Sequence, residues 1–137
     1  SNGIAELTML AKDPDSGLWL KCKFDWLRFD LIAVDLKTTR STNPDDWAYQ
    51  ASDLGYDLQD AFYCYVACLC GIEIKAFPFV CVEFAELDNC EVYELSSRTR
   101  SNANMKMKYF IKEFNECKNN NYWYGYNKSQ SVTVIDF

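Results

Sequence analysis

The alternation of apolar and polar residues predicts two neighbouring strands in the first third of the chain. Residues 18–24 alternate as a half-buried strand does, after a stretch at 12–17 that is dense in turn formers. Residues 31–37 begin with four consecutive apolar side chains, which indicates burial on both faces, as at the centre of a sheet. Because the segment 28–30 between the two strands is short enough for a turn, we expect a hairpin.

A helical pattern follows this hairpin. Asn43 suits an N-cap, and Pro44 suits the first helical position. Helical sequence then runs to about Cys70, with a bend expected near Gly55 and an end at Gly71.

The second half of the chain predicts strands and one more helix. Strands are expected around 77–84 and 91–95, and an amphipathic helix over about 101–118, with Met105, Tyr109, Ile111 and Phe114 as candidate core contacts. Residues 119–127 are expected to be irregular, and 131–137 to form a last short strand. This order predicts a single domain over residues 1–137 of the α/β (α+β) class, with a small mixed β-sheet flanked by helices.

The composition fits such a domain. Its 137 residues are 49% hydrophobic and 16% aromatic, which argues against disorder. No apolar run approaches the roughly 18 residues that cross a bilayer, and no signal peptide opens the chain, so no membrane partner is expected. The start, Ser1-Asn2-Gly3 without Met, is typical of a cloning scar or a trimmed fragment.

The seven cysteines are an odd number, and most lie in apolar segments. They indicate free, buried thiols and a reducing, cytoplasmic setting rather than a disulfide framework. Cys64, Cys68 and Cys70 are close in sequence, yet their spacing is not that of a CxxC pair, and the chain has no histidine to complete a zinc site.

The net charge of −6 opposes binding to a nucleic acid, because cations that neutralise phosphates supply much of the affinity. Two arrangements remove the conflict: carboxylates gathered around a divalent metal, or oligomerisation that lines up basic patches. Six of the fourteen Lys and Arg residues lie between Lys12 and Arg40.

Three residues in this segment carry the candidate chemistry. Asp35 and Lys37 share one face of their strand, about 6.5–7 Å apart at Cα. Asp25, at the end of the preceding strand, can reach the same sheet edge. Two converging carboxylates suit Mg²⁺ or Mn²⁺, and a lysine beside them can hold an attacking water or stabilise a pentavalent phosphate. Phosphodiester hydrolysis requires such a set.

Acid-x-Lys triplets alone are weak evidence, because residues 73–75 and 116–118 have the same pattern. The second of these lies in a predicted helix, where positions i and i+2 do not share a face, and no acid at the end of a paired strand precedes the first. Gln59 and Tyr63, four residues apart, project from one helix face and can present an amide and a phenol to a phosphate or a catalytic water. The alternative for this pair is an ordinary amphipathic helix.

Three segments, 21–27 (KCKFDWL), 34–39 (VDLKTT) and 55–63 (GYDLQDAFY), closely resemble the exonuclease VIII (RecE-type) branch of the PD-(D/E)XK nucleases. The similarity covers roughly residues 5–95. It implies a restriction-endonuclease-like core, related to lambda exonuclease and RecB-type nuclease domains. It also implies a helical region before the core that this chain lacks.

The resemblance assigns roles to individual residues. Asp25 and Asp35 correspond to the metal-binding acids, Lys37 to the catalytic lysine, and Gln59 and Tyr63 to the QxxxY motif. The backbone carbonyl of Leu36 and the upstream acid Glu6, in Ala5-Glu6-Leu7-Thr8, are implied as further metal ligands.

The resemblance implies a Mg²⁺-dependent (or Mn²⁺-dependent) exodeoxyribonuclease that digests duplex DNA 5′-to-3′ in recombination or phage DNA processing. The implied partners are DNA, a single-strand annealing recombination protein and further copies of the chain in a ring. The alternative is a non-catalytic DNA-binding or assembly module that keeps the fold. Intact Asp25, Asp35 and Lys37 favour the enzyme, since an inactive module does not need all three.

Overall fold

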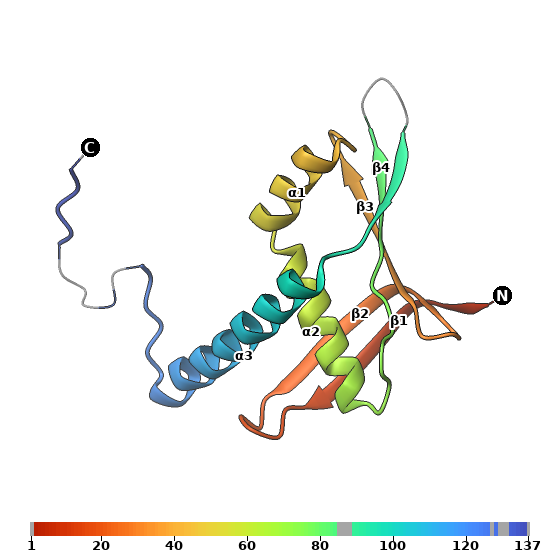
Figure 1. The fold of residues 1–137 in the computed structure, drawn as a ribbon. Coiled ribbons are helices and arrows are strands. Elements are labelled where there is room, and N and C mark those ends of the chain that lie inside the picture. The colour runs from red at the N-terminus through yellow and green to blue at the C-terminus, as the bar shows by residue number, and fades with distance from the viewer. Residues whose placement is uncertain (1, 85–88, 127, 129–131, 137) are drawn as a thin grey trace.

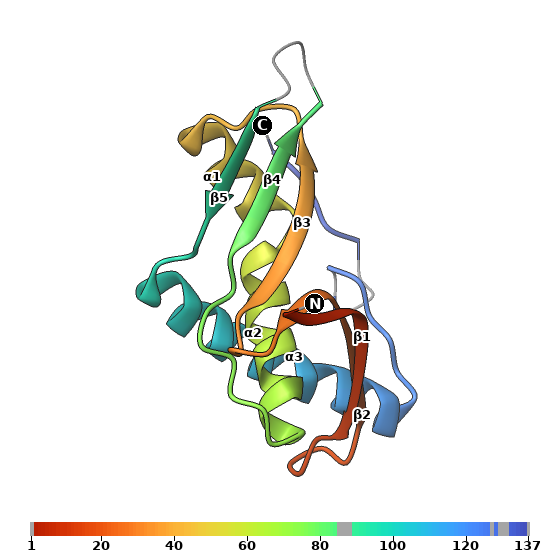
Figure 2. The same ribbon diagram turned by 90° about the vertical axis from the view of Figure 1, so that its right-hand side faces the viewer.

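A computed structural model describes residues 2–84, 89–126, 128 and 132–136. Its strands form one five-stranded sheet in the order β1-β2-β3-β4-β5 (Figures 1 and 2). The strands are β1 (Gly3–Lys12), β2 (Trp19–Arg28), β3 (Ala33–Thr39), β4 (Phe79–Glu83) and β5 (Cys90–Tyr93), and the helices are α1 (Pro44–Asp53), α2 (Tyr56–Leu69) and α3 (Ser97–Asn120). Strands β3 and β4 are parallel and the other neighbours antiparallel, so the predicted mixed sheet flanked by helices is confirmed.

The helices lie on one side of the sheet. Turning the molecule so that the sheet faces the viewer places α1 and α2 behind it (Figure 2). The core forms between this side of the sheet and α2, where Val66, Phe24 and Phe79 are almost completely buried. No helix in the described part of the chain is both long and apolar enough to cross a membrane.

Strand β1 is the element that the sequence pattern did not predict. It pairs with β2 from Gly3 opposite Arg28 to Lys12 opposite Trp19, with an interruption at Glu6. Burial alternates only in its second half, where Met9 and Ala11 are buried. Glu6 has a φ of 54°, and this left-handed residue interrupts the alternation that would have identified the strand.

The turn between β1 and β2 is organised by the carboxylate of Asp13. This buried carboxylate accepts hydrogen bonds from the Ser16 backbone N–H (2.8 Å), the Ser16 hydroxyl (2.5 Å) and the Tyr65 hydroxyl of α2 (2.5 Å). These donors lower the pKa of Asp13, although burial alone would raise it. Asp13 therefore joins the hairpin to the helix that packs beneath it.

Strand β3 lies at the centre of the sheet, as its apolar start predicted. Burial on both faces is wrong, however, because the Leu36 side chain is 58% exposed. The predicted hairpin between β2 and β3 is present, but these strands pair only through Trp26 with Val34 and Leu27 with Ala33. Beyond those two pairs β3 continues alongside β4, and β2 diverges from it.

The helical segment after β3 is two helices rather than one bent helix. The Asn43 side chain caps α1 as predicted, accepting a hydrogen bond from the Asp45 backbone N–H at 3.0 Å. Gly55, with a φ of 70°, separates α1 from α2, and Gly71, with a φ of 80°, follows the end of α2.

The core face predicted for the last helix is wrong. Met105, Tyr109 and Phe114 are all more than half exposed, and only Ile111 packs against the core. The buried face runs through Ala103 and Met107 instead, at a spacing of four residues. The helix also begins earlier, with Ser96 as its N-cap. Small side chains let α3 approach α2 closely, and a pattern that counts only large apolar residues misses such a face.

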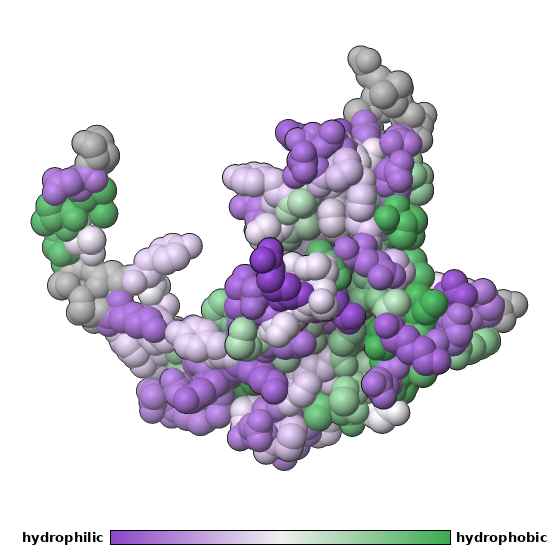
Figure 3. All heavy atoms as spheres, in the orientation of Figure 1, coloured by the Kyte–Doolittle hydropathy of each residue, from purple (hydrophilic) through white to green (hydrophobic). Residues whose placement is uncertain are grey.

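The last predicted strand is also wrong where the structure describes it. Residues 132–136 have no regular structure, and Val132, Val134 and Ile135 are exposed. Figure 3 shows this segment standing away from the body. β-Branched residues favour a strand only where a neighbouring strand is available, and this segment has none among the described residues. Residues 131 and 137 of that prediction lie outside the described residues.

Replacing Asp13 with alanine should remove three hydrogen bonds to a buried carboxylate and leave the Tyr65 hydroxyl unpaired. We expect a loss of about 2–3 kcal/mol in the free energy of unfolding, measured by urea denaturation. The control is Asp15→Ala in the same turn, where the side chain is exposed. Equal stabilities for the two variants would contradict this account of the turn.

Candidate active site

The divergence of β2 from β3 exposes an edge of β3 at Leu36. Its backbone N–H donates a hydrogen bond to Oδ2 of Asp25, at 2.8 Å, and not to a neighbouring strand. In an extended strand the N–H and C=O of one residue point to the same side. The Leu36 carbonyl therefore also points to the side on which the Asp25 carboxylate lies.

Asp35, Lys37 and Gln59 form a closed triangle of polar contacts. Nζ of Lys37 lies 2.5 Å from Oδ2 of Asp35 and donates a hydrogen bond to Oε1 of Gln59 at 2.8 Å. Nε2 of Gln59 donates in turn to Oδ1 of Asp35 at 2.5 Å. The side chains of Asp35 and Lys37 are only 5% and 17% exposed, so these contacts are well shielded from water. Gln59 thus points into the same site as the two β3 residues.

Two aromatic rings support the Lys37 ammonium. Nζ lies 4.5 Å from the ring centre of Tyr56 and 5.9 Å from that of Phe79, distances at which a cation is attracted to the ring face. Sequence reasoning missed Tyr56. The sequence feature that could have identified Tyr56 is its spacing from Gln59 and Tyr63, which places the three residues on one face of α2.

The carboxylate of Asp35 is in a costly environment. Burial raises its pKa, the nearby Asp25 raises it further, and Lys37 and Gln59 act in the opposite direction. Oδ2 of Asp35 has the Lys37 ammonium as its partner, in the 2.5 Å ion pair. A buried carboxylate next to a second carboxylate favours a bound cation.

Tyr63 lies at the inner edge of the site. Its ring packs at 5.3 Å from Phe24 and 6.1 Å from Phe77, between ring centres. Burial raises the pKa of the Tyr63 phenol, and the charge of Asp35 adds to this rise. The phenol is therefore neutral near pH 7 and can donate a hydrogen bond.

Glu6 is placed differently from the other candidates. The register of β1 and β2 sets it opposite Asp25, but its exposed carboxylate forms an ion pair with Lys23. Among the described residues, no three His, Cys, Asp or Glu side chains are arranged to hold a metal ion. The structure brings together the carboxylates of Asp25 and Asp35, and the backbone carbonyl of Leu36 points to the same side as Asp25. Hard oxygen donors of this kind fit Mg²⁺ or Mn²⁺.

The remaining acid-x-Lys triplets lie apart from this constellation, whereas Cys81 is the register partner of Lys37 on β4. Glu73 and Lys75 are exposed on the segment between α2 and β4, and Glu116 and Lys118 are exposed on α3. The expectation of buried thiols holds for only part of the set, since Cys68, Cys70 and Cys90 are exposed.

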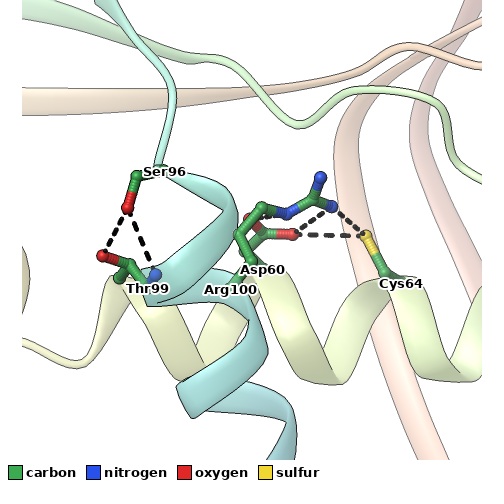
Figure 4. Close-up of polar contacts among 5 residues, drawn as sticks. All are labelled: Asp60, Cys64, Ser96, Thr99 and Arg100. Atoms are coloured by element: carbon green, nitrogen blue, oxygen red, sulfur yellow. Dashed lines mark hydrogen bonds and ion pairs between the residues drawn. The ribbon is translucent and has the colours of Figure 1, made fainter.

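The helix that carries Gln59 is fixed by a buried ion pair beside it. The Asp60 carboxylate is almost fully buried and faces the Arg100 guanidinium of α3, with Nε 2.9 Å from Oδ2 and Nη2 donating to Oδ1 at 3.0 Å (Figure 4). The Cys64 thiol donates to the same carboxylate at 3.3 Å. Burial and this carboxylate raise the pKa of Cys64 to about 12, so the thiol remains protonated. Helix α3 thus contacts α2 at Asp60, the residue that follows Gln59 in the sequence.

Comparisons with known proteins identify this fold. The chain resembles the crystal structure of a protein from Eubacterium rectale that is named a putative exonuclease, with a TM-score of 0.68 and 18% identity over 86% of this chain and 46% of that one. The crystal structure of SSO0001 is a more distant match, with a TM-score of 0.49 and 19% identity over 85% of this chain and 55% of that one. The chain therefore spans about half the length of each.

The mixed sheet and its helices define a PD-(D/E)XK-type nuclease fold. Over residues 1–132 the chain matches the family described as PDDEXK-like domain of unknown function (DUF3799), and it belongs to that family. No curated protein sequence matches it.

Removing the Arg100 side chain should leave the buried Asp60 carboxylate without its cation. We expect Arg100→Ala to lower the free energy of unfolding by about 3 kcal/mol. The matched control is Lys106→Ala, because Lys106 pairs with Asp57 between the same two helices but is 59% exposed. A loss below about 1 kcal/mol for Arg100→Ala, in chemical denaturation, would show that this pair does not hold α2 in place.

Proposed function

We propose that this protein is a divalent-metal-dependent deoxyribonuclease whose active site is formed by Asp25, Asp35, Lys37, Gln59 and Tyr63. The observation that carries the proposal is the convergence of the Asp35–Lys37–Gln59 triangle with Asp25 at the point where β2 leaves β3. Two carboxylates, a shielded ammonium and a neutral phenol are the groups that phosphodiester hydrolysis uses.

The carboxylates of Asp25 and Asp35 and the carbonyl of Leu36 would hold the metal. A bound Mg²⁺ or Mn²⁺ would supply positive charge for the phosphoryl oxygens and acidify water. Glu6 is a further candidate ligand only if its pairing with Lys23 is exchanged for the metal.

Lys37 would act on the reacting phosphate. A cation held by Asp35 would release the ammonium from its ion pair, and the charge could then stabilise the phosphoryl oxygens or hold the attacking water. Gln59 contacts both Asp35 and Lys37 and so sets the separation between metal ligand and ammonium. Tyr63 can donate its hydroxyl proton in a hydrogen bond to the substrate phosphate.

We further propose exonuclease action on duplex DNA, 5′-to-3′, in recombination or phage DNA processing. The sequence resemblance to the RecE-type branch supports this finer assignment, and the fold likeness to a protein named as an exonuclease agrees with it. The same resemblance supports assembly of several copies into a ring, and a single-strand annealing protein as partner. A ring would also bring basic patches together around the DNA, which is one way to offset the net charge of −6.

The Lys37→Ala variant should lose cleavage by at least about a hundredfold while it stays folded and its metal affinity does not fall. The ammonium acts on charge that develops in the transition state and is not itself a metal ligand. Cleavage of a labelled duplex in Mg²⁺ measures this, with Lys75→Ala as the control from an exposed acid-x-Lys triplet. Wild-type cleavage by Lys37→Ala would show that the active site lies elsewhere.

The Asp25→Asn and Asp35→Asn variants should each lose both cleavage and most of their Mn²⁺ affinity. An amide oxygen is a weaker ligand than a carboxylate for a hard cation, so we expect an increase of about tenfold or more in the Kd measured by calorimetry. Asp53→Asn, an exposed aspartate at the end of α1, is the control. Unchanged Mn²⁺ binding in both variants would contradict the metal assignment. A wild-type protein that binds DNA but neither binds Mn²⁺ nor cuts would be the non-catalytic module instead.

A further inference from the structure

The β1–β2 hairpin has two faces with different chemistry. One face, with Met9, Cys22 and Phe24, is buried against the core. The opposite face is exposed along the paired segment from Thr8 to Lys12 and from Trp19 to Lys23. Across the two strands its residues pair as Thr8 with Lys23, Leu10 with Lys21, and Lys12 with Trp19. We call this surface the outer hairpin face.

Three lysines and one indole dominate the outer hairpin face. Lys23 is paired with Glu6, whereas neither Lys12 nor Lys21 has an ion-pair partner within the described part of the chain. The Trp19 side chain is 66% exposed. The chain has a net charge of −6, but this surface is locally positive because its two unpaired cations flank an exposed aromatic ring.

The corresponding surface of the other strands is unlike it. On β3, β4 and β5 the residues Leu36, Val80 and Val92 stand in register across three strands and are apolar. Leu36 and Val92 are more than half exposed. The lysines are therefore a particular property of the hairpin and not of the exposed sheet surface in general.

Strand β2 connects the outer hairpin face, which points away from α2, to Asp25 at the edge of the candidate active site. Strand β2 carries Trp19, Lys21 and Lys23 and then, two residues further, Asp25. Asp25 lies six positions after Trp19 along the strand, a distance of roughly 20 Å. That is the length of about six stacked nucleotides of one strand.

We propose that the outer hairpin face binds an unpaired DNA strand next to the scissile phosphate, with Lys12 and Lys21 on its phosphates and Trp19 stacked on a base. The proposal rests on the proposed nuclease function and adds the path of the substrate strand. Ammonium groups bind phosphates without regard to sequence, and an exposed indole stacks with any unpaired base. A fully paired duplex offers no free base to Trp19, so the indole selects single-stranded DNA.

An apolar protein segment is the competing occupant. Trp19 and Lys21 also border a groove of about 410 Å³ whose other walls include Phe110 and Phe114 of α3. A partner that fills this groove would depend on Trp19 but not on Lys12, which lies on β1 outside the groove lining. A dependence on Lys12 as well as on Trp19 therefore separates the DNA strand from the protein segment.

The test is binding of a fluorescein-labelled single-stranded oligonucleotide in EDTA, followed by fluorescence anisotropy. Lys12→Ala/Lys21→Ala should weaken binding about tenfold and reduce the slope of log affinity against log salt by about 1.4, or about 0.7 for each lysine on a single strand. Trp19→Ala should weaken single-strand binding about tenfold and leave binding of a blunt duplex nearly unchanged. The matched controls, Lys108→Ala/Lys118→Ala on α3 and the exposed Tyr126→Ala, should bind as wild type.

A small phosphodiester keeps this proposal separate from the nuclease assignment. Bis(p-nitrophenyl) phosphate is too small to span the active site and the outer hairpin face together, so its Mn²⁺-dependent hydrolysis should be equal in wild type and in the variants of that face. Wild-type single-strand affinity in both Lys12→Ala/Lys21→Ala and Trp19→Ala would overturn the DNA path and leave the nuclease assignment intact. Loss of self-association in Trp19→Ala, without loss of DNA affinity, would assign the surface to a protein segment. Absence of all hydrolysis in wild type would overturn the nuclease assignment, while the anisotropy would still decide the hairpin surface.

Discussion

The divergence of β2 from β3 is the constraint on which the site depends. A strand edge in a folded protein must satisfy its backbone donors, and β2 leaves β3 before it can accept a hydrogen bond from Leu36. The Asp25 side chain accepts this bond instead, and its carboxylate is thereby fixed beside the central strand. The hydrogen bond that replaces strand pairing at Leu36 thus also brings Asp25 towards Asp35.

The same arrangement places two carboxylates close together, one of them buried, where a negative charge without a partner is costly. Asp35 is buried, and its one ammonium partner is itself shielded by Tyr56 and Gln59. The α2 helix that supplies these two residues is held by the Asp60–Arg100 pair from α3. Supporting contacts of this kind hold the reacting groups in position. The stability of the fold and the geometry of the site therefore depend on the same contacts.

The sequence predicted the hairpin, the N-cap at Asn43 and the class of fold, because these depend on local patterns and short connections. Membership of the PD-(D/E)XK superfamily is confirmed, whereas the RecE-type branch and the roles of the site residues stay predictions. The failures depend on tertiary contacts. Strand β1 contains a left-handed residue, the buried face of α3 uses Ala103, and Tyr56 belongs to the site only because Lys37 lies over its ring.

The central claim is that Asp25, Asp35 and the Leu36 carbonyl form a divalent-metal site at the point where β2 and β3 separate. Anomalous diffraction from crystals soaked in Mn²⁺ tests it most directly, because it locates the ion without reference to activity. We expect a single strong peak within about 2–2.6 Å of oxygens from both carboxylates, with Lys37 no longer in contact with Asp35. A peak at other acidic residues, or none here while Lys37 remains paired with Asp35, would contradict the claim.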